Sequence, residues 1–172
     1  GFPEKHRFPM DKFRLLHTYL KEQGLATKEN TIRPGKAKIE LLETAHCPKY
    51  LHRFIHNELD NKEERRMGLP WSEGLVRRTL ISPNGTFLTA NLALENGIAC
   101  HLAGGTHHAH FDFGSGFCII NDLSVTALGL IERAKAKGQK AEKTFMELIA
   151  LLGGIASSLG TVPTDSDPTP RF

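Results

Sequence analysis

Gly104–Asp122 reads GGTHHAHFDFGSGFCIIND, and no other stretch of the chain places so many reactive side chains between so many glycines. Its glycine pair, Gly104 and Gly105, allows positive φ and a close approach of the backbone to a ligand. His107 and His108 follow the pair, and the mostly apolar run 98–103 before it predicts a short buried strand. The histidines are therefore expected where a strand ends and a loop begins, the usual place for active-site groups in parallel α/β sheets.

The same loop offers the donor types that zinc prefers, from His107, His108, His110 and Asp112. Their spacing is poor for a single ion. Neighbouring residues on an extended backbone point to opposite sides, so that His108, His110 and Asp112 share one face and His107 does not. We therefore expect no dedicated metal site in this loop.

Helical spacing of apolar residues is found on the N-terminal side of this loop. Phe13, Leu16 and Leu20 predict a helix that stops at Gly24, and Pro48 is suited to begin a second one.

Three further segments have recognisable signals. The charged run 60–66 is interpreted as a solvated connection. Ser72 is predicted to cap a helix that the turn sequence SPNG at 82–85 interrupts, and Asp122 is predicted to cap a helix over 123–137.

Composition sets looser bounds. A chain of 172 residues suits a single domain with a real core, and 40% hydrophobic with 24% charged residues is typical of a globular protein. The net charge of +3 is small and the basic residues are scattered, so direct nucleic-acid binding is not implied. The longest apolar run, 148–156, is too short to span a bilayer. Three cysteines without a CxxC pair favour a reducing, cytoplasmic compartment.

The combination of HHA, GxGFC and ND within 107–122 resembles the signature of the zinc-dependent histone deacetylase family, which includes acetoin-utilisation and acetylpolyamine deacetylases. Three other segments are similar to the family's start, its HxxxY segment and a helix-opening turn: His6–Met10 (HRFPM), Thr44–Tyr50 (TAHCPKY) and Leu69–Arg78 (LPWSEGLVRR). The resemblance is continuous from about His6 to Leu130.

This resemblance implies a three-layer α/β fold with a mainly parallel sheet, as part of an arginase/deacetylase-like fold. The partial domain is expected over residues 1–160, followed by a flexible tail at 161–172. A sheet edge left uncovered would favour an oligomer.

The resemblance also implies roles for the loop residues in hydrolysis of acetyl-lysine or acetylated amines. His107 and His108 would be the general acid/base pair. Gly116 would present its backbone carbonyl to the substrate amide, Phe117 would form one wall of the acyl tunnel, and Cys118 would lie behind that wall.

The resemblance becomes faint where the family carries its zinc ligands. The family's Asp-x-Asp-x-His strand corresponds to a segment of 145–160, which places Glu147 near the first Asp and Ile149 and Leu151 at the two ligand positions. Neither of these two side chains can bind a metal. Zinc is thus the cofactor of the family, and we expect that this chain does not bind it.

Three functions remain open at this point. The chain could be a deacetylase-family protein, truncated or altered, that keeps its substrate-side loops without a competent metal centre. It could instead be a non-catalytic acyl-binding or interaction module, or an incomplete gene product. His46 is equally open between packing at a helix end and a role on the substrate side.

Overall fold

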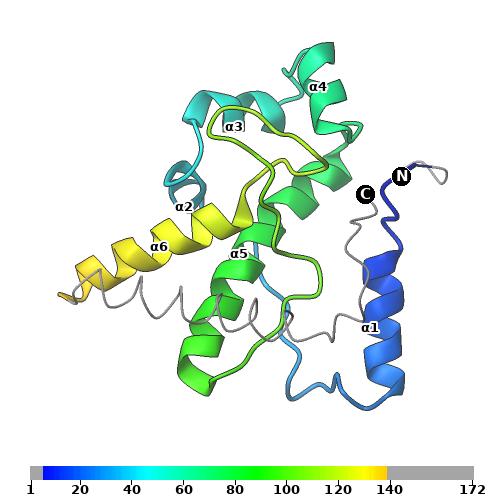
Figure 1. Ribbon diagram of the computed structural model, residues 1–172, viewed down its shortest axis with the longest axis vertical. Coiled ribbons are helices and arrows are strands. Elements are labelled where there is room, and N and C mark those ends of the chain that lie inside the picture. Colours follow the sequence, from blue (N-terminus) through cyan, green and yellow to red (C-terminus); the bar gives the residue numbers. More distant parts are fainter. Residues whose placement is uncertain (1–5, 139–172) are drawn as a thin grey trace, which may run out of the picture. The chain divides into compact units, whose positions relative to one another are not determined.

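The computed structural model describes residues 6–138, and the chain divides into one unit that ends at Leu130 and another that begins at Ile131. The described residues form the helices labelled in Figure 1: α1 (Lys12–Glu22), α2 (Ile39–Glu43), α3 (Pro48–Ile55), α4 (Asn61–Met67), α5 (Glu73–Asn96) and α6 (Asp122–Ala136). Helices α1 to α5 belong to the first unit, and α6 begins in it. Among the helices of residues 6–138, none combines the length and the apolar character that a bilayer-spanning segment needs.

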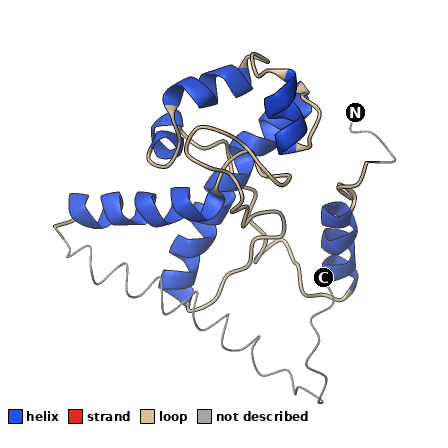
Figure 2. Cartoon of the chain, turned by 45° about the horizontal axis from the view of Figure 1, so that its top comes forward, coloured by secondary structure: helices blue, strands red, loops and turns tan. Residues whose placement is uncertain are grey.

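No β-strand occurs between residues 6 and 138 (Figure 2). Within these residues, Ser115 and Cys118 form an isolated antiparallel β-bridge. The strand predicted over 98–103 is wrong, because this segment is irregular and Ile98 is 79% exposed. A strand requires a neighbour for its backbone hydrogen bonds, and an apolar run cannot supply one by itself. The three-layer sheet therefore remains an expectation that these residues do not test.

Helices α1 and α3 confirm the predictions from apolar spacing. Helix α1 is followed by Gly24 at φ +69°, and α3 has Pro48 in its first turn. Helix α6 also forms, but its cap differs from the prediction. The Oδ1 atom of Asn121 accepts a hydrogen bond from the Ser124 N–H at 3.0 Å, and Asp122 is the first helical residue.

The charged run 60–66 is not a connection but contains α4. Asp60 accepts hydrogen bonds from the backbone of Lys62 and Glu63, and the Glu63 carboxylate accepts one from the Asp60 N–H. This capping box satisfies donors that otherwise face solvent. The buried side chain of Met67 anchors the other end of the helix, and Gly68 ends it at φ +75°.

Helix α5 begins as predicted, with the Ser72 hydroxyl accepting from the Leu75 N–H at 3.1 Å. It is not interrupted at 82–85, and the buried Pro83 lies inside it. Proline lacks an N–H and crowds the turn before it, so nearby carbonyls need other donors. Just before the proline, the Leu80 carbonyl accepts a hydrogen bond from the Ala37 N–H at 2.7 Å, which ties a distant segment to this part of the helix.

The core of the first unit contains residues from α2, α3, α4, α5 and the start of α6. It also contains the end of the segment 97–121 between α5 and α6, which we call the histidine loop. Its fully or nearly fully buried apolar residues are Ala37, Leu42, Tyr50, Leu51, Phe54, Met67, Leu69, Leu75, Ile119, Ile120 and Val125. Burying such side chains contributes about 1.5–3 kcal/mol each. Because Ile119 and Ile120 belong to this core, one end of the histidine loop is fixed by packing.

Candidate functional site

The paired histidines lie in the long loop between α5 and α6 (Figure 1). Both side chains are exposed, and their ring centroids are 4.2 Å apart with an angle of 42° between the planes. The expectation that His107 and His108 point to opposite sides is therefore wrong. Gly105, at φ +85°, turns the chain just before them, and its carbonyl lies 3.0 Å from His107 Nδ1. The backbone is thus not a regular extended strand at this point.

The second glycine segment of the loop lies against His108. A Cβ atom built on Gly116, which has φ +55°, would be 3.3 Å from both Cβ and Cγ of His108. Both residues are exposed, so this contact borders solvent. The structure therefore brings together His108 and Gly116, two of the residues predicted to form the site.

Phe117 is half-buried, with φ +63° and its N–H donating to the Met67 carbonyl at 2.9 Å. Its ring lies 5.5 Å from the ring of Phe8 and 5.9 Å from that of His6. The N-terminal HRFPM segment thus packs against the residue predicted to line the acyl tunnel. Cys118 follows as a buried free thiol.

Asn121 holds the backbone on both sides of His108. Its Nδ2 atom lies 3.2 Å from the carbonyl oxygen of His107 and 3.2 Å from that of Ala109. Its backbone N–H donates to His46 Nε2 at 2.9 Å. The sequence pattern includes Asn121 only within the ND motif and predicts no contact for it.

His46 is completely buried, which settles its role in favour of packing. Burial lowers its pKa, and the neighbouring backbone of Phe111 partly opposes this effect. Four residues further along the chain, the Tyr50 hydroxyl donates to the Ile119 carbonyl at 2.9 Å, and burial raises the pKa of this phenol. The TAHCPKY segment therefore anchors the second half of the loop rather than facing a substrate.

A buried polar cluster supports the first half of the loop. The Asp122 carboxylate is 1% exposed and accepts hydrogen bonds at Oδ2 from Ser82 Oγ at 2.7 Å and Thr86 Oγ1 at 3.2 Å. Ser82 Oγ also lies 3.2 Å from the Ala103 carbonyl. The cluster links α5, the start of α6 and the segment that leads to the histidines.

His101 extends this cluster, with Nδ1 3.1 Å from Thr86 Oγ1. Burial lowers the pKa of its imidazole, and the Asp122 carboxylate opposes the shift. A Cβ atom on Gly104 would lie 1.9 Å from His101 Nδ1 and 2.4 Å from Thr86 Oγ1. Side chains of the protein itself therefore occupy the space beside Gly104, and a larger residue would have to displace them.

The described residues do not fit a zinc site. No group of three or more His, Cys, Asp or Glu side chains within 6–138 is arranged to hold a metal ion. The His110 N–H donates to the Phe113 carbonyl at 2.9 Å, and the His110 ring stacks on Phe113 at 4.3 Å. This turn breaks the alternation that would place His108, His110 and Asp112 on one face. Ile149 and Leu151 lie outside the described residues.

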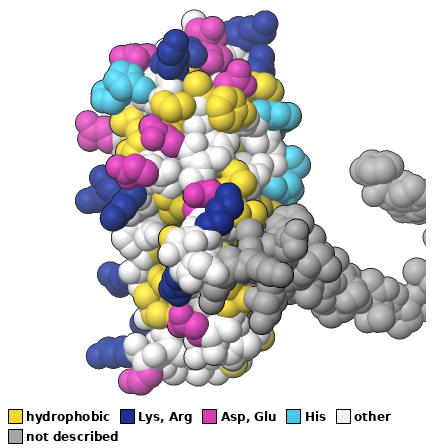
Figure 3. Space-filling model, turned by 90° about the vertical axis from the view of Figure 1, so that its left-hand side faces the viewer, with side chains coloured by type: hydrophobic (Ala, Val, Ile, Leu, Met, Phe, Trp, Pro, Cys, Tyr) yellow, Lys and Arg dark blue, Asp and Glu magenta, His cyan; other side chains and the backbone are white. Residues whose placement is uncertain are grey.

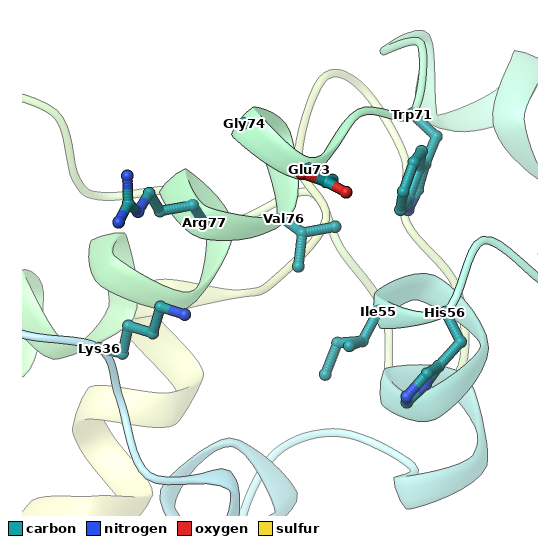
Figure 4. A pocket seen from close by; sticks show the side chains of 8 residues that line it. All are labelled: Lys36, Ile55, His56, Trp71, Glu73, Gly74, Val76 and Arg77. Carbon is teal, nitrogen blue, oxygen red and sulfur yellow. The ribbon is translucent and has the colours of Figure 1, made fainter.

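A surface hollow of about 590 Å³ lies elsewhere, and no residue of the histidine loop lines it. Its lining, shown in Figure 4, consists of Lys36, Ile55, His56, Trp71, Glu73, Gly74, Val76 and Arg77. The half-buried indole of Trp71 is fixed by a 2.8 Å hydrogen bond from Nε1 to the Phe54 carbonyl.

On the face of the molecule shown in Figure 3, acidic and basic side chains are intermixed and do not gather into patches of one charge.

Comparison of the sequence and the structure with known proteins identifies relatives of this chain. Residues 6–140 match the histone deacetylase domain. The chain is 50% identical over 135 residues to an uncharacterised protein of Picosynechococcus sp., covering 78% of this chain and 45% of that protein. It is 28% identical over 142 residues to the acetoin utilization protein AcuC of Staphylococcus xylosus, covering 77% and 37%.

Among solved structures, that of a histone deacetylase homologue from Aquifex aeolicus is similar with a TM-score of 0.65 and 20% identity, over 77% of this chain and 38% of that one. This likeness confirms a deacetylase-type fold for the matched portion. In each of these comparisons the chain spans less than half of the relative's length.

Proposed function

Because the chain belongs to the histone deacetylase family, we propose that its described part forms the substrate side of an amide-hydrolysing site, with His107 and His108 as the proton-transfer pair. The observation that carries this proposal is the placement of two exposed imidazoles 4.2 Å apart, with His108 beside Gly116. Histidine suits this chemistry because its ordinary pKa lies close to neutral pH.

Hydrolysis of an amide requires a proton to leave the attacking water and another to reach the departing amine. In the proposed site one imidazole of the pair accepts the first proton and one donates the second. The Gly116 carbonyl accepts a hydrogen bond from the substrate amide N–H, and Phe117 lies along the acyl chain. The substrate class is acetyl-lysine or another acetylated amine, as the family suggests.

Zinc supplies water activation and carbonyl polarisation in this family. Under the alignment of Ile149 and Leu151 with the family's ligand positions, this chain does not hold that ion, and residues 6–138 provide no replacement set. We therefore propose a domain over 1–160 that retains substrate-side groups without its own metal centre.

We also place the protein in a reducing, intracellular compartment. Cys47, Cys100 and Cys118 all lie within the described residues and none forms a disulfide. Thiols stay reduced in such compartments.

The second candidate is a non-catalytic acyl-binding module, which the lack of a metal donor set among the described residues favours. Measurements of binding and of amine release distinguish this module from the hydrolytic site. In an NMR titration, Nε-acetyl-lysine at millimolar concentration should shift the ring signals of His107 and His108, while lysine should not. Unchanged histidine signals would contradict both candidates, and amine release that disappears when His107 or His108 is replaced would rule out the module.

A further inference from the structure

We propose that Asn121 is a positioning residue for His108, acting through the carbonyl groups on either side of it; this inference rests on the proposed function of the histidine pair. The Nδ2 atom of Asn121 is 3.2 Å from both the His107 and the Ala109 carbonyl oxygen. These two carbonyls belong to the residues that flank His108 in sequence. Fixing both leaves the imidazole little freedom beyond its own side-chain torsions.

Both the amide nitrogen and the amide oxygen of the Asn121 side chain have hydrogen-bond partners. A primary amide has two N–H donors and a carbonyl acceptor. Here the two donors serve the loop, and Oδ1 accepts from the Ser124 N–H at 3.0 Å to cap α6. The backbone N–H of the same residue is bound by the buried His46. Asn121 is thereby fixed to the core on one side and to the loop on the other.

Capping alone does not explain this residue. A helix N-cap needs only an acceptor, and Ser, Asp or Asn serve almost equally well. The two N–H donors are specific to the amide, and in this protein both are directed at the backbone around His108. The direction of the imidazole matters, because misplacing a catalytic group by about 1 Å can cost roughly a hundredfold in rate.

The cap and the positioning role can be separated by substitution. In Asn121→Ser the hydroxyl still caps α6 but is too short to reach the two carbonyls. Asn121→Ala loses the cap as well. We expect Asn121→Ser to melt closer to the unmodified protein than Asn121→Ala. Both variants should lose the proton contacts in the NOE spectrum that the closeness of His108 to the Gly116 backbone predicts.

A measurement on the unmodified protein guards against variants that fail to fold. The side-chain amide protons of Asn121 should exchange with solvent more slowly than those of the exposed Asn61. Equal exchange rates, or intact His108 to Gly116 contacts in folded Asn121→Ser, would overturn the inference.

The functional consequence is measured with Nε-acetyl-lysine as the probe. We expect its affinity to fall about tenfold or more in Asn121→Ser, because the loosened loop must be ordered again when the probe binds. Unchanged affinity in a variant that has lost the contacts would contradict the positioning role. If the unmodified protein does not bind the probe, the proposed function fails, but the NOE and exchange measurements still decide whether Asn121 holds the loop.

Discussion

His46 Nε2 accepts a 2.9 Å hydrogen bond from the backbone N–H of Asn121, a residue 75 positions further along the chain. The accepting nitrogen must be unprotonated, which assigns the proton of the neutral ring to Nδ1. The bond joins the turn before α3 to the end of the histidine loop, inside the core. The imidazole is thus a structural connector whose neutral form the fold requires.

This relationship predicts a pH dependence of stability. Burial lowers the pKa of His46 from its ordinary 6.5, so below that pH the unfolded chain binds a proton that the folded chain does not. The free energy of unfolding should therefore decrease as pH falls below 6.5. Urea unfolding at several pH values from mildly acidic to neutral measures this free energy.

Two variants test the assignment to His46. In His46→Gln the decrease with falling pH should be smaller. In Leu42→Ala, which weakens the core without removing a titrating group, the decrease should persist. An unchanged slope in His46→Gln would contradict the assignment.

The buried carboxylate of Asp122 supports a second prediction. Ser82→Ala removes one of its donors and leaves a buried acceptor less satisfied, which costs about 1–3 kcal/mol. Chemical denaturation of Ser82→Ala, Asp122→Asn and the double variant gives the coupling between the two residues. Ser124→Ala, on the same helix but outside this cluster, is the control. Purely additive effects of the two substitutions would mean that the 2.7 Å contact contributes nothing.

Patterns carried by neighbouring residues are sufficient to predict part of this fold. Apolar spacing predicts α1 and α3, and Ser72 is correctly identified as a cap because capping depends on a few adjacent residues. The helix at 61–67 is missed although Asp60 and Glu63 have the spacing of a capping box, because a run of charges is also typical of solvated chain.

Features that depend on distant partners are not predicted. Pro83 stays within α5 while the Ala37 N–H supplies the Leu80 carbonyl from another segment, and nothing near 82–85 indicates this. The contacts of Asn121 likewise span 12 and 14 residues. The histidine pair can be proposed as a site from local sequence, but the residues that hold its backbone cannot be predicted in this way.

Gly104 gives a third prediction. Its missing Cβ leaves room for the imidazole of His101, so Gly104→Ala must displace that ring and break its contact with Thr86. Overpacking of this kind costs about 1–3 kcal/mol. Thermal unfolding should show Gly104→Ala destabilised, and His101→Ala should reduce the penalty in the double variant because the colliding ring is gone. Equal penalties for the alanine at 104 with and without His101 would contradict the collision with His101 and would leave the Thr86 hydroxyl, 2.4 Å from the same Cβ, as the obstacle.

The last prediction concerns activity. We expect the unmodified chain not to release amine from Nε-acetyl-lysine at an enzyme-like rate with or without added zinc. The described residues contain no metal donor set, and Ile149 and Leu151, which lie beyond them, cannot supply one. Even one missing oxyanion-stabilising donor typically costs roughly a hundredfold to a thousandfold in turnover.

The variant with Ile149→Asp and Leu151→His should gain weak zinc affinity at most, because a catalytic zinc normally has three protein ligands. Metal stoichiometry after dialysis measures this affinity. Zinc-dependent turnover by the unmodified chain that disappears in His108→Ala would refute the alignment of the two ligand positions, and would identify a metal site formed by residues that the alignment does not include.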